Sequence, residues 1–351
     1  MSLIFNWQDL KNRTKAYTYN DVLIIPSKSD MRSRKDPDLT SRLTKSITLE
    51  IPFVSANMDT ITEAPMAQAM AKEGGIGILH RFMPIEDQVT QVRQMKEQGV
   101  EHVCASVGVN QDFKERTQSL TEAGVDVITV DIAHGHSVAM LETLKWIKDN
   151  HPGVEVIAGN VATPQGTLDL IEAGADAIKV GIGPGSMCTT RVITGCGVPQ
   201  LTAVALCAEE AMKHNIPIIA DGGIKTSGDI VKAFAAGATT VMLGSILSGT
   251  LETPGEIRHG KKLYRGMASK SAQESWRGGV PKGMAAEGES TYVSIKGHVR
   301  DVINELSGGL RSGMTYINAN SLNEIRDKAQ FMEMSGMGMA ESVAHGLGAN
   351  V

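Results

Sequence analysis

Eight short apolar runs recur along the chain, and five of them follow a stretch that ends at a glycine after helical spacing. Glu172-Ala173-Gly174, for example, leads directly into Ala177–Val180. Glycine is the usual residue just past a helix end, and a short continuous apolar run is typical of a buried strand. The pattern predicts strands at Pro52–Ser55, Ile76–Leu79, His102–Val107, Val125–Val130, Val154–Ala158, Ala177–Val180, Pro217–Ala220 and Thr240–Leu243.

The number of predicted strands indicates the fold class. Strands that are apolar throughout lie in parallel sheets covered by helices on both faces. Eight of them close into a (β/α)8 barrel, the TIM barrel, so we expect one barrel domain over residues 1–351, with a doubly wound open sheet as the alternative. The first fifty residues, with a predicted strand at Asp21–Ile25, are expected to form an N-terminal arm.

A long insertion follows the eighth predicted strand, between Leu247 and Leu310. Its glycine- and serine-rich part, residues 266–290, predicts a lid over the working face of the barrel. Gly308–Gly313 is interpreted as a further flexible turn. The C-terminal segment of about 320–351 contains a methionine-rich tail, Met332–Met339, which we expect to pack on the surface or against another subunit.

Polar residues stand just after several predicted strands, where the loops of a barrel build its working face. Local hydrogen bonding could explain each of them alone, but their convergence on one rim favours a functional site. Metal binding by His134 and His136 is disfavoured, because no carboxylate or third histidine has matching spacing. The rim residues are Asn57, Asp59, His80, Arg81, Asp131, His134 and Asn160.

The segment Lys179–Arg191 is the strongest candidate for chemistry. The apolar run before it ends in a loop with three glycines and a proline, which presents the thiol of Cys188 near Arg191 and several hydroxyl groups. Such surroundings can stabilise a thiolate, which is a nucleophile. A small buried residue under a tight turn is the alternative, and the composition of the loop favours chemistry.

Two glycine-containing turns follow the seventh and eighth predicted strands, Asp221-Gly222-Gly223 and Gly244-Ser245. Barrels commonly bind a phosphate group at these positions through backbone N–H groups. The sequence therefore predicts a phosphorylated substrate and leaves Asp221 for a neighbouring hydroxyl. Glycines that merely permit tight turns are the alternative.

Composition narrows the class of protein. The 351 residues are 42% hydrophobic and 21% charged, which is enough for a large core, and the net charge of −5 with scattered basic residues disfavours nucleic acid or a membrane surface as partner. Small-molecule chemistry is favoured.

The cysteines form no CxxC pair, which argues against disulfides and structural zinc, and no apolar run approaches membrane-spanning length. We therefore expect a cytoplasmic protein. The cysteines are Cys104, Cys188, Cys196 and Cys207.

From about Tyr19 to Glu341, long motifs resemble the IMP dehydrogenase/GMP reductase family. They are Ala56-Asn57-Met58-Asp59-Thr60, Ala158-Gly159-Asn160-Val161, Gly181 to Arg191, Ile219-Ala220-Asp221-Gly222-Gly223, Val241-Met242-Leu243-Gly244-Ser245, Tyr264-Arg265-Gly266-Met267 and Gly308-Gly309-Leu310-Arg311-Ser312. Dehydrogenases of the family usually insert a pair of regulatory CBS modules after the second strand. Here His80–Met83 leads straight into the next predicted helix, so no CBS modules are expected.

The lid separates the two activities of the family. Dehydrogenase lids carry an Arg-Tyr pair, whose arginine activates the water that hydrolyses a covalent intermediate. This lid has Trp276-Arg277 and resembles the shorter reductase lid. The resemblance implies an NADPH-dependent GMP reductase that forms IMP and ammonia. An IMP dehydrogenase without CBS modules is the alternative, since Leu141–Lys148 and Arg81 are more similar to dehydrogenases. A catalytically silent nucleotide-binding regulatory protein is the alternative of another class.

The resemblance also implies roles for single residues. Cys188 would attack purine C2, while Thr190 and Glu287 would manage the protons that expel ammonia. Asp221 would hold the ribose. The phosphate would lie on Gly222, Gly223, Gly244 and Ser245, and the base would be bracketed by Gly266, Met267, Ala268, Met284, Ala285, Ala286 and Gly288.

The cofactor NADPH would contact Ser33, Arg34, Arg81, Asp131, Ile132, Ala133, Ile182 and Gly183, together with Ser312, Gly313, Met314 and Thr315 of a neighbouring subunit. The resemblance also implies a homotetramer. Backbone carbonyl groups resemble a monovalent-cation site, expected to hold potassium. The residues of that site are Gly183, Gly185, Cys188 and Arg191.

Overall fold

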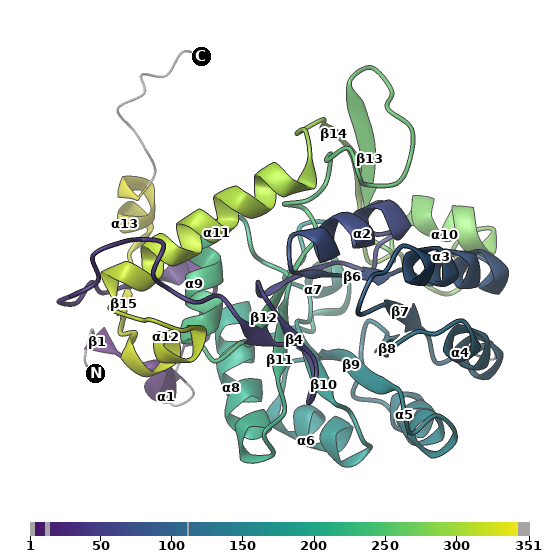
Figure 1. Ribbon diagram of the computed structural model, residues 1–351, viewed down its shortest axis with the longest axis horizontal. Helices are drawn as coiled ribbons and strands as arrows, with labels where there is room; N and C mark the ends of the chain where they lie inside the picture. The colour runs from purple at the N-terminus through teal and green to yellow at the C-terminus, as the bar shows by residue number, and fades with distance from the viewer. Residues whose placement is uncertain (1–3, 11–14, 111, 343–351) are drawn as a thin grey trace.

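The computed structural model describes residues 4–10, 15–110 and 112–342, and its centre is a closed barrel of eight parallel strands (Figure 1). Pairing of β12 with β5, where Val241 lies beside Phe53, closes the sheet and excludes the doubly wound alternative. The predicted TIM barrel is confirmed, and each predicted strand overlaps an observed one. The barrel strands are β5 (Phe53–Ser55), β6 (Ile76–Leu79), β7 (Cys104–Val107), β8 (Val127–Asp131), β9 (Glu155–Val161), β10 (Ala177–Val180), β11 (Ile218–Asp221) and β12 (Thr240–Leu243).

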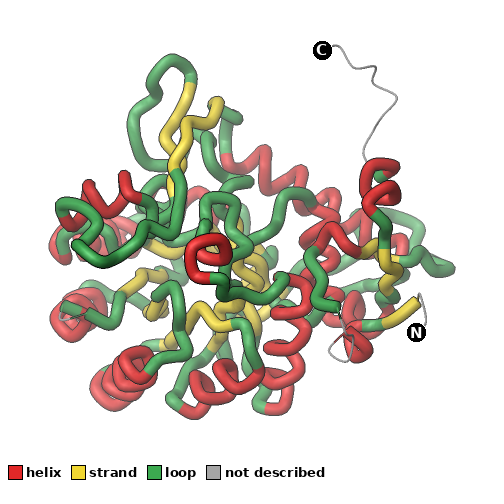
Figure 2. Tube along the Cα trace, turned by 180° about the vertical axis from the view of Figure 1, so that it is seen from behind, coloured by secondary structure: helices red, strands yellow, loops and turns green. Residues whose placement is uncertain are grey.

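Helices surround the barrel and bury its outer face (Figure 2). Glycines that follow five of them, such as Gly74 at φ +84° and Gly237 at φ +104°, adopt the left-handed conformation that ends a helix. The helices are α2 (Ala64–Lys72), α3 (Ile85–Glu97), α4 (Phe113–Glu122), α5 (Val138–Asn150), α6 (Pro164–Glu172), α8 (Gln200–Lys213), α9 (Ser227–Ala235) and α11 (Val299–Tyr316). A further short helix, α7 (Thr190–Thr194), lies in the loop after β10 and buries no residue.

The N-terminal arm and the C-terminal segment pack on each other. Strand β15 (Phe331–Glu333) lies between β1 (Ile4–Phe5) and β2 (Val22–Ile24), and Met332 of the methionine-rich tail pairs with Leu23. The predicted strand at Asp21–Ile25 thus corresponds to β2. The remaining elements of these regions are α1 (Trp7–Leu10), η1 (Tyr19–Asp21), β3 (Ser41–Arg42), β4 (Thr48–Leu49), α12 (Leu322–Lys328) and α13 (Gly336–Glu341).

The insertion after β12 contains more regular structure than its composition predicts. Strands β13 (Lys261–Arg265) and β14 (Ser290–Ser294) form an antiparallel hairpin that stands out from the body in Figures 1 and 2. Between them, the lid 266–290 carries the helix α10 (Lys270–Arg277). Ser269 begins this helix by accepting a hydrogen bond from the backbone N–H of Ala272.

The turn expected at Gly308–Gly313 is wrong, because these residues lie inside α11. Gly309 and Gly313 are four residues apart and therefore lie on one face of the helix, against α9. A Cβ atom on Gly309 would lie 2.1 Å from the hydroxyl of Ser227, and one on Gly313 would lie 2.6 Å from Val231. The glycines let two helices approach closely, which is a packing role.

In the part of the chain that the structure describes, no helix is both long and apolar enough to cross a membrane.

Candidate active site

The loop after β10 holds Cys188 over the C-terminal end of the barrel. Gly181 starts the loop at φ +154°, and a Cβ atom there would lie 2.1 Å from the backbone oxygen of Asp221, so only glycine fits. The backbone N–H of Cys188 donates to the Gly185 carbonyl at 3.0 Å. Cys188 is partly exposed, so its thiol can be reached by a ligand.

The three residues predicted to be catalytic form one hydrogen-bonded chain. Cys188 Sγ donates to Thr190 Oγ1 at 3.1 Å, and Thr190 Oγ1 donates to Glu287 Oε2 at 2.8 Å. Thr190 and Glu287 are 97 residues apart in the sequence. The chain connects a thiol through a hydroxyl to a carboxylate, which is the order needed to move a proton away from a nucleophile.

Backbone pairing keeps the lid against the thiol loop. Cys188 and Gly288 form an antiparallel bridge, and the N–H of Thr189 donates to the carbonyl of Glu287 at 3.1 Å. On the other side, the N–H of Glu287 donates to the Ala268 carbonyl at 3.0 Å. The predicted base-bracketing segments at 266–268 and 284–288 therefore lie beside the thiol loop, as a lid should.

The two predicted phosphate turns lie near the same loop. Gly222 adopts φ +95°, and a Cβ atom on it would lie 2.8 Å from Pro184. A Cβ atom on Gly244 would lie 3.6 Å from the Tyr264 hydroxyl, which lies 3.1 Å from Ser186 Oγ. Backbone groups and hydroxyls from three loops thus surround one small region.

Tyr264 belongs to the motif Tyr264–Met267, and its position beside the thiol loop is not evident from the sequence. Its side chain is buried, and burial raises the pKa of its hydroxyl although hydrogen bonds with Ser186 and Ser245 oppose that shift. The hydroxyl therefore stays protonated and can donate a hydrogen bond.

A buried lysine organises the centre of the rim. Lys179 Nζ lies 2.7 Å from Asp131 Oδ1 and 2.8 Å from Asp221 Oδ2, and it also donates to the side-chain oxygen of Asn160. Asn57 Nδ2 donates to the second oxygen of Asp131 at 2.9 Å. Three of the rim residues, Asn57, Asp131 and Asn160, therefore belong to one network with Asp221 and Lys179, so side chains from the ends of different strands converge.

Charge pairing within this network outweighs the cost of burial. Burial alone would lower the pKa of the Lys179 ammonium, but Asp131 and Asp221 raise it above its usual value. Burial would likewise raise the pKa of the Asp131 carboxyl, and the charge of Lys179 lowers it. Lys179 and Asp131 are therefore both ionised at neutral pH. The signal for this hub in the sequence is one charged residue inside an otherwise apolar strand, which is stable only when it is paired.

The other rim residues take part in separate contacts. Asp59 pairs with Arg265, and His80 Nε2 lies 3.2 Å from Glu63 Oε1. His136 Nε2 lies 2.7 Å from Asp169 Oδ2, and the described residues contain no cluster of three or more groups suited to a metal ion among His, Cys, Asp and Glu. A histidine-based metal site finds no support here.

Arg81 is partly buried, and one of its nitrogen atoms lies in the interior. Its guanidinium lies 4.7 Å from the ring of Phe82, and its Nε has no hydrogen-bond partner among the described residues. Burial lowers the pKa of this guanidinium, which Asp131 partly opposes. A buried donor without a partner is suited to an incoming acceptor.

The residues predicted to hold the cofactor fall into two groups. Arg81, Asp131, Ile132, Ala133, Ile182 and Gly183 follow β6, β8 and β10 at the rim. Ser33 and Arg34 lie on the arm, and residues 312–315 lie in the second half of α11, on the side of the molecule opposite α10 in Figure 1. Arm and helix touch, since Arg311 Nε donates to the Pro37 carbonyl at 3.3 Å.

Within residues 312–315, only part of the side-chain surface is available. Met314 is fully buried and Gly313 faces Val231 of α9. Thr315 Oγ1 donates to the Ser312 carbonyl at 2.7 Å. That residues 312–315 contact the cofactor of a neighbouring subunit stays a prediction.

Fold and site together define a TIM-barrel protein with a thiol at the C-terminal end of its strands and a lid that brings a carboxylate to it. Known proteins identify the class more closely. The family model described as "IMP dehydrogenase / GMP reductase domain" matches residues 16–345. The chain therefore belongs to the IMP dehydrogenase/GMP reductase family of oxidoreductases, whose members use a nicotinamide cofactor.

Similar proteins carry both names of the family. An inosine-5′-monophosphate dehydrogenase of Nitrosopumilus maritimus is 38% identical, with 94% of this chain and 98% of that protein covered. Another, from Halalkalibacterium halodurans, is 37% identical, with 97% of each chain covered. A crystal structure of a cysteine-to-alanine variant of GMP reductase from Trypanosoma brucei, in complex with guanosine 5′-monophosphate, has a TM-score of 0.91 and 34% identity, covering 96% of this chain and 99% of that one. The family resemblance in the sequence is thus confirmed.

Proposed function

We propose that this protein is a GMP reductase, which converts GMP and NADPH to IMP, ammonia and NADP in the interconversion of purine nucleotides. The observation that carries the proposal is the chain Cys188–Thr190–Glu287 under a lid without an Arg-Tyr pair. The similarity to the trypanosomal GMP reductase with bound GMP supports it.

In this proposal, Cys188 adds to C2 of the purine. Its proton passes through Thr190 to Glu287, along the two hydrogen bonds of the chain. Glu287 then returns the proton to the C2 amino group, which leaves as ammonia while sulfur stays bonded to C2. The nicotinamide cofactor, when bound, would supply a hydride to C2. The C2–sulfur bond then breaks, which releases IMP and returns Cys188 as a thiolate. A thiolate suits this sequence because it is both a good nucleophile and a good leaving group at neutral pH.

The nucleotide would be held through its phosphate and ribose. The N–H groups of Gly222, Gly223, Gly244 and Ser245 would bind the phosphate. In the hydrogen bonds of the described residues, only Oδ2 of Asp221 is engaged, by Lys179 and Asn160, so Oδ1 is available to a ribose hydroxyl. Gly266–Ala268 and Met284–Gly288 would bracket the base.

NADPH would be held by the two groups of residues described above. Arg81 fits this role, because its buried Nε awaits an acceptor. A second subunit would supply residues 312–315, and we accordingly propose a homo-oligomer, a tetramer by family resemblance, in the cytoplasm.

The proposed potassium site consists of backbone carbonyls in one turn. The Gly185 carbonyl already accepts from the N–H of Cys188 and the Arg191 carbonyl from that of Gly195. Each carbonyl oxygen has a second lone pair, so both can still contact a cation. Gly183 and Cys188 would complete this side of the site.

An IMP dehydrogenase without CBS modules is the second candidate. Relatives named as IMP dehydrogenases are 36–38% identical, and Arg277 of the lid could take the place of the water-activating arginine. A silent nucleotide-binding regulator is less favoured, because the complete chain Cys188–Thr190–Glu287 is retained.

A spectrophotometric comparison tests the proposal. Purified protein is mixed with GMP and NADPH, and separately with IMP and NAD, while absorbance at the nicotinamide band is followed. We expect steady oxidation of NADPH and little reduction of NAD. IMP-dependent reduction of NAD at a comparable rate would contradict the reductase assignment, and turnover of neither pair would favour the silent regulator.

A further inference from the structure

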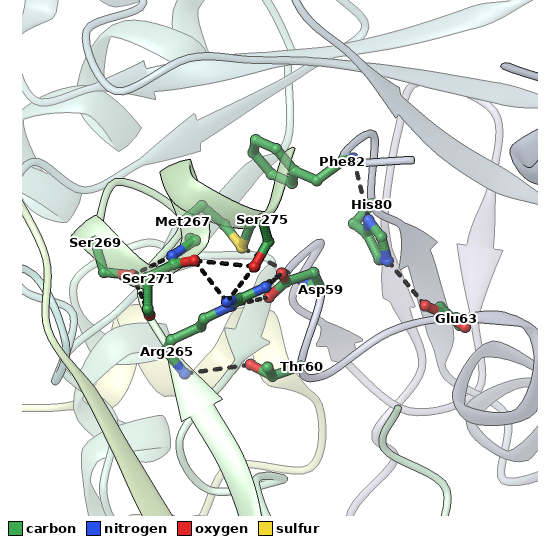
Figure 3. Close-up of polar contacts among 11 residues, drawn as sticks. Asp59, Thr60, Glu63, His80, Phe82, Arg265, Met267, Ser269, Ser271 and Ser275 are labelled. Carbon is green, nitrogen blue, oxygen red and sulfur yellow. Dashed lines mark hydrogen bonds and ion pairs between the residues drawn. The ribbon is translucent and has the colours of Figure 1, made fainter. Parts of the chain in front are cut away.

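Arg265 connects the base of the lid to the barrel. It is the last residue of β13, and its side chain and that of Asp59 are each only 12% exposed. Arg265 Nε lies 3.0 Å from Asp59 Oδ2 and 3.3 Å from Oδ1. Asp59 lies in the loop after β5. Both oxygens of its carboxylate face the arginine (Figure 3). Removing one partner of a nearly buried ion pair leaves the other charge uncompensated.

The same guanidinium holds the lid helix α10. Arg265 Nη1 donates to the Ser271 carbonyl at 2.8 Å and to Ser275 Oγ at 3.0 Å. Figure 3 shows the guanidinium in contact with Asp59 and with both serines. Because the donors of a guanidinium have fixed directions, one side chain sets the distance between the β5 loop and α10.

The end of α10 makes a second contact with the barrel. The ring of Trp276 lies 5.3 Å from that of Phe82, in the loop after β6. The backbone N–H of Phe82 donates to His80 Nδ1 at 3.1 Å, which keeps the aromatic ring in place. The lid helix is therefore held to two neighbouring barrel loops.

Backbone hydrogen bonds lead from Arg265 to Glu287. The N–H of Gly266, the next residue, donates to the Glu289 carbonyl at 2.9 Å, and the N–H of Glu287 donates to the Ala268 carbonyl at 3.0 Å. Residues 287–289 thus lie between a segment that begins at Arg265 and the thiol loop. A displacement of Arg265 would displace the Glu287 carboxylate from Thr190.

We propose that Asp59 and Arg265 are positioning residues for Glu287. They act by fixing the lid segment that carries this carboxylate, and they need no contact with the substrate. The inference rests on the role of Glu287 in the proposed function. It extends that function to an ion pair which links the β5 loop to the proton chain of the active site.

A double-mutant cycle on the full-length protein tests the inference. Asp59→Asn should lower kcat for GMP and NADPH by about 10²-fold, the order of loss for a group displaced by an ångström, with a smaller change in KM for GMP. In a Glu287→Gln background the same substitution should lower kcat little further, because residues that act as a unit are not additive. Equal losses in both backgrounds would overturn the inference.

A matched control is available on the same helix. Glu274→Gln breaks the exposed pair with Lys270, whose side chains are 54% and 77% exposed and 3.8 Å apart, and should leave kcat unchanged. If Asp59→Asn does not fold, Ser275→Ala removes one of the two bonds from Arg265 to α10, together with the bond from the Ser275 hydroxyl to the Ser271 carbonyl, and keeps the ion pair with Asp59. It should give a smaller loss of kcat that also disappears in the Glu287→Gln background, and a loss that persists there would again overturn the inference.

A second measurement separates this inference from the proposed function. The rate at which iodoacetamide alkylates Cys188 is followed against pH without any nucleotide. Asp59→Asn should shift the profile in the same direction as Glu287→Gln, and Glu274→Gln should not shift it. If the protein turns over neither GMP nor IMP, the proposed function fails and this profile alone decides; an unshifted profile in Asp59→Asn then overturns the inference.

Discussion

The rim network around Lys179 and the lid anchor around Arg265 both bury a cation against carboxylates, but they are built differently. Asp131, Asn160 and Asp221 each belong to a hydrogen-bonded barrel strand, so the sheet itself brings them to Lys179. Arg265 instead joins a barrel loop to a helix of the insertion, and no common sheet holds these parts. We infer that loss of the rim network costs mainly stability, whereas loss of the lid anchor costs mainly catalysis.

The largest effect on catalysis is expected at Cys188. Cys188→Ala should abolish turnover of GMP, because no other group on the loop can form the covalent intermediate. GMP affinity, measured by isothermal titration calorimetry, should stay within a small factor, since phosphate and ribose contacts provide ground-state binding. Retained turnover in this variant would rule out covalent catalysis by Cys188.

The next effect belongs to the lid. Glu287→Gln should lower the rate of GMP reduction by about 10²–10⁴-fold, the usual contribution of a general acid–base group. GMP binding should change much less, because the amide fills the same space. Steady-state kinetics with separate kcat and KM values check this, and a change confined to KM would show that Glu287 binds substrate without transferring protons.

Substitution of Lys179 tests whether its network mainly stabilises the fold. Lys179→Met leaves Asp131 and Asp221 buried without their cation and should destabilise the protein by about 3–5 kcal/mol in urea unfolding. Lys270→Met on α10 is the control, since that side chain is 77% exposed and surface changes stay within about 0.5 kcal/mol. Equal stabilities of the two variants would contradict the inference that the network around Lys179 stabilises the fold.

The stability difference between wild type and Lys179→Met should depend on pH. The pKa of Asp131 is lowered in the folded protein, so its stabilising contribution is present above its ordinary value of about 3.9 and disappears as the pH falls through the lowered value. The pKa of Lys179 is raised, so its contribution is lost only in strong alkali. The stability difference between wild type and Lys179→Met should therefore be constant near neutral pH and shrink in acid.

The smallest effects are expected at the other cysteines. Burial raises the pKa of Cys104 and of Cys207 to about 12, so neither forms a thiolate near neutral pH, and Cys196 is exposed outside the proton chain. Serine at Cys196 should leave kcat unchanged. Mass spectrometry after iodoacetamide treatment should show that GMP protects Cys188 alone. Protection of Cys196 would show that the nucleotide binds at a different place from the one proposed.

Much of this architecture follows from local pattern. The barrel strands are short apolar runs, five of which follow a helix that ends at glycine, and both signals depend on neighbours close in the sequence. The thiol loop and the Asp221-Gly222-Gly223 turn are visible for the same reason, because glycines there permit conformations that other residues avoid. Long motifs then identify the family.

Glycine is also where local reasoning fails. Gly309 and Gly313 predict a turn by composition but belong to α11, where their missing side chains let the helix approach Ser227 and Val231. The sequence contains no sign of which helix they face. A glycine in a turn and a glycine at a helix contact have the same composition and differ only in what lies opposite.

The sequence by itself determined the barrel, its family and the position of the nucleophile, since these depend on contiguous segments. Only the tertiary structure decided the partners of charged side chains. Lys179 pairs with Asp131 and Asp221, and Arg265 pairs with Asp59, which lies 206 positions away in the sequence. Such pairs form because burial makes an unpaired charge costly, and which charges meet depends on the closed barrel and the folded lid.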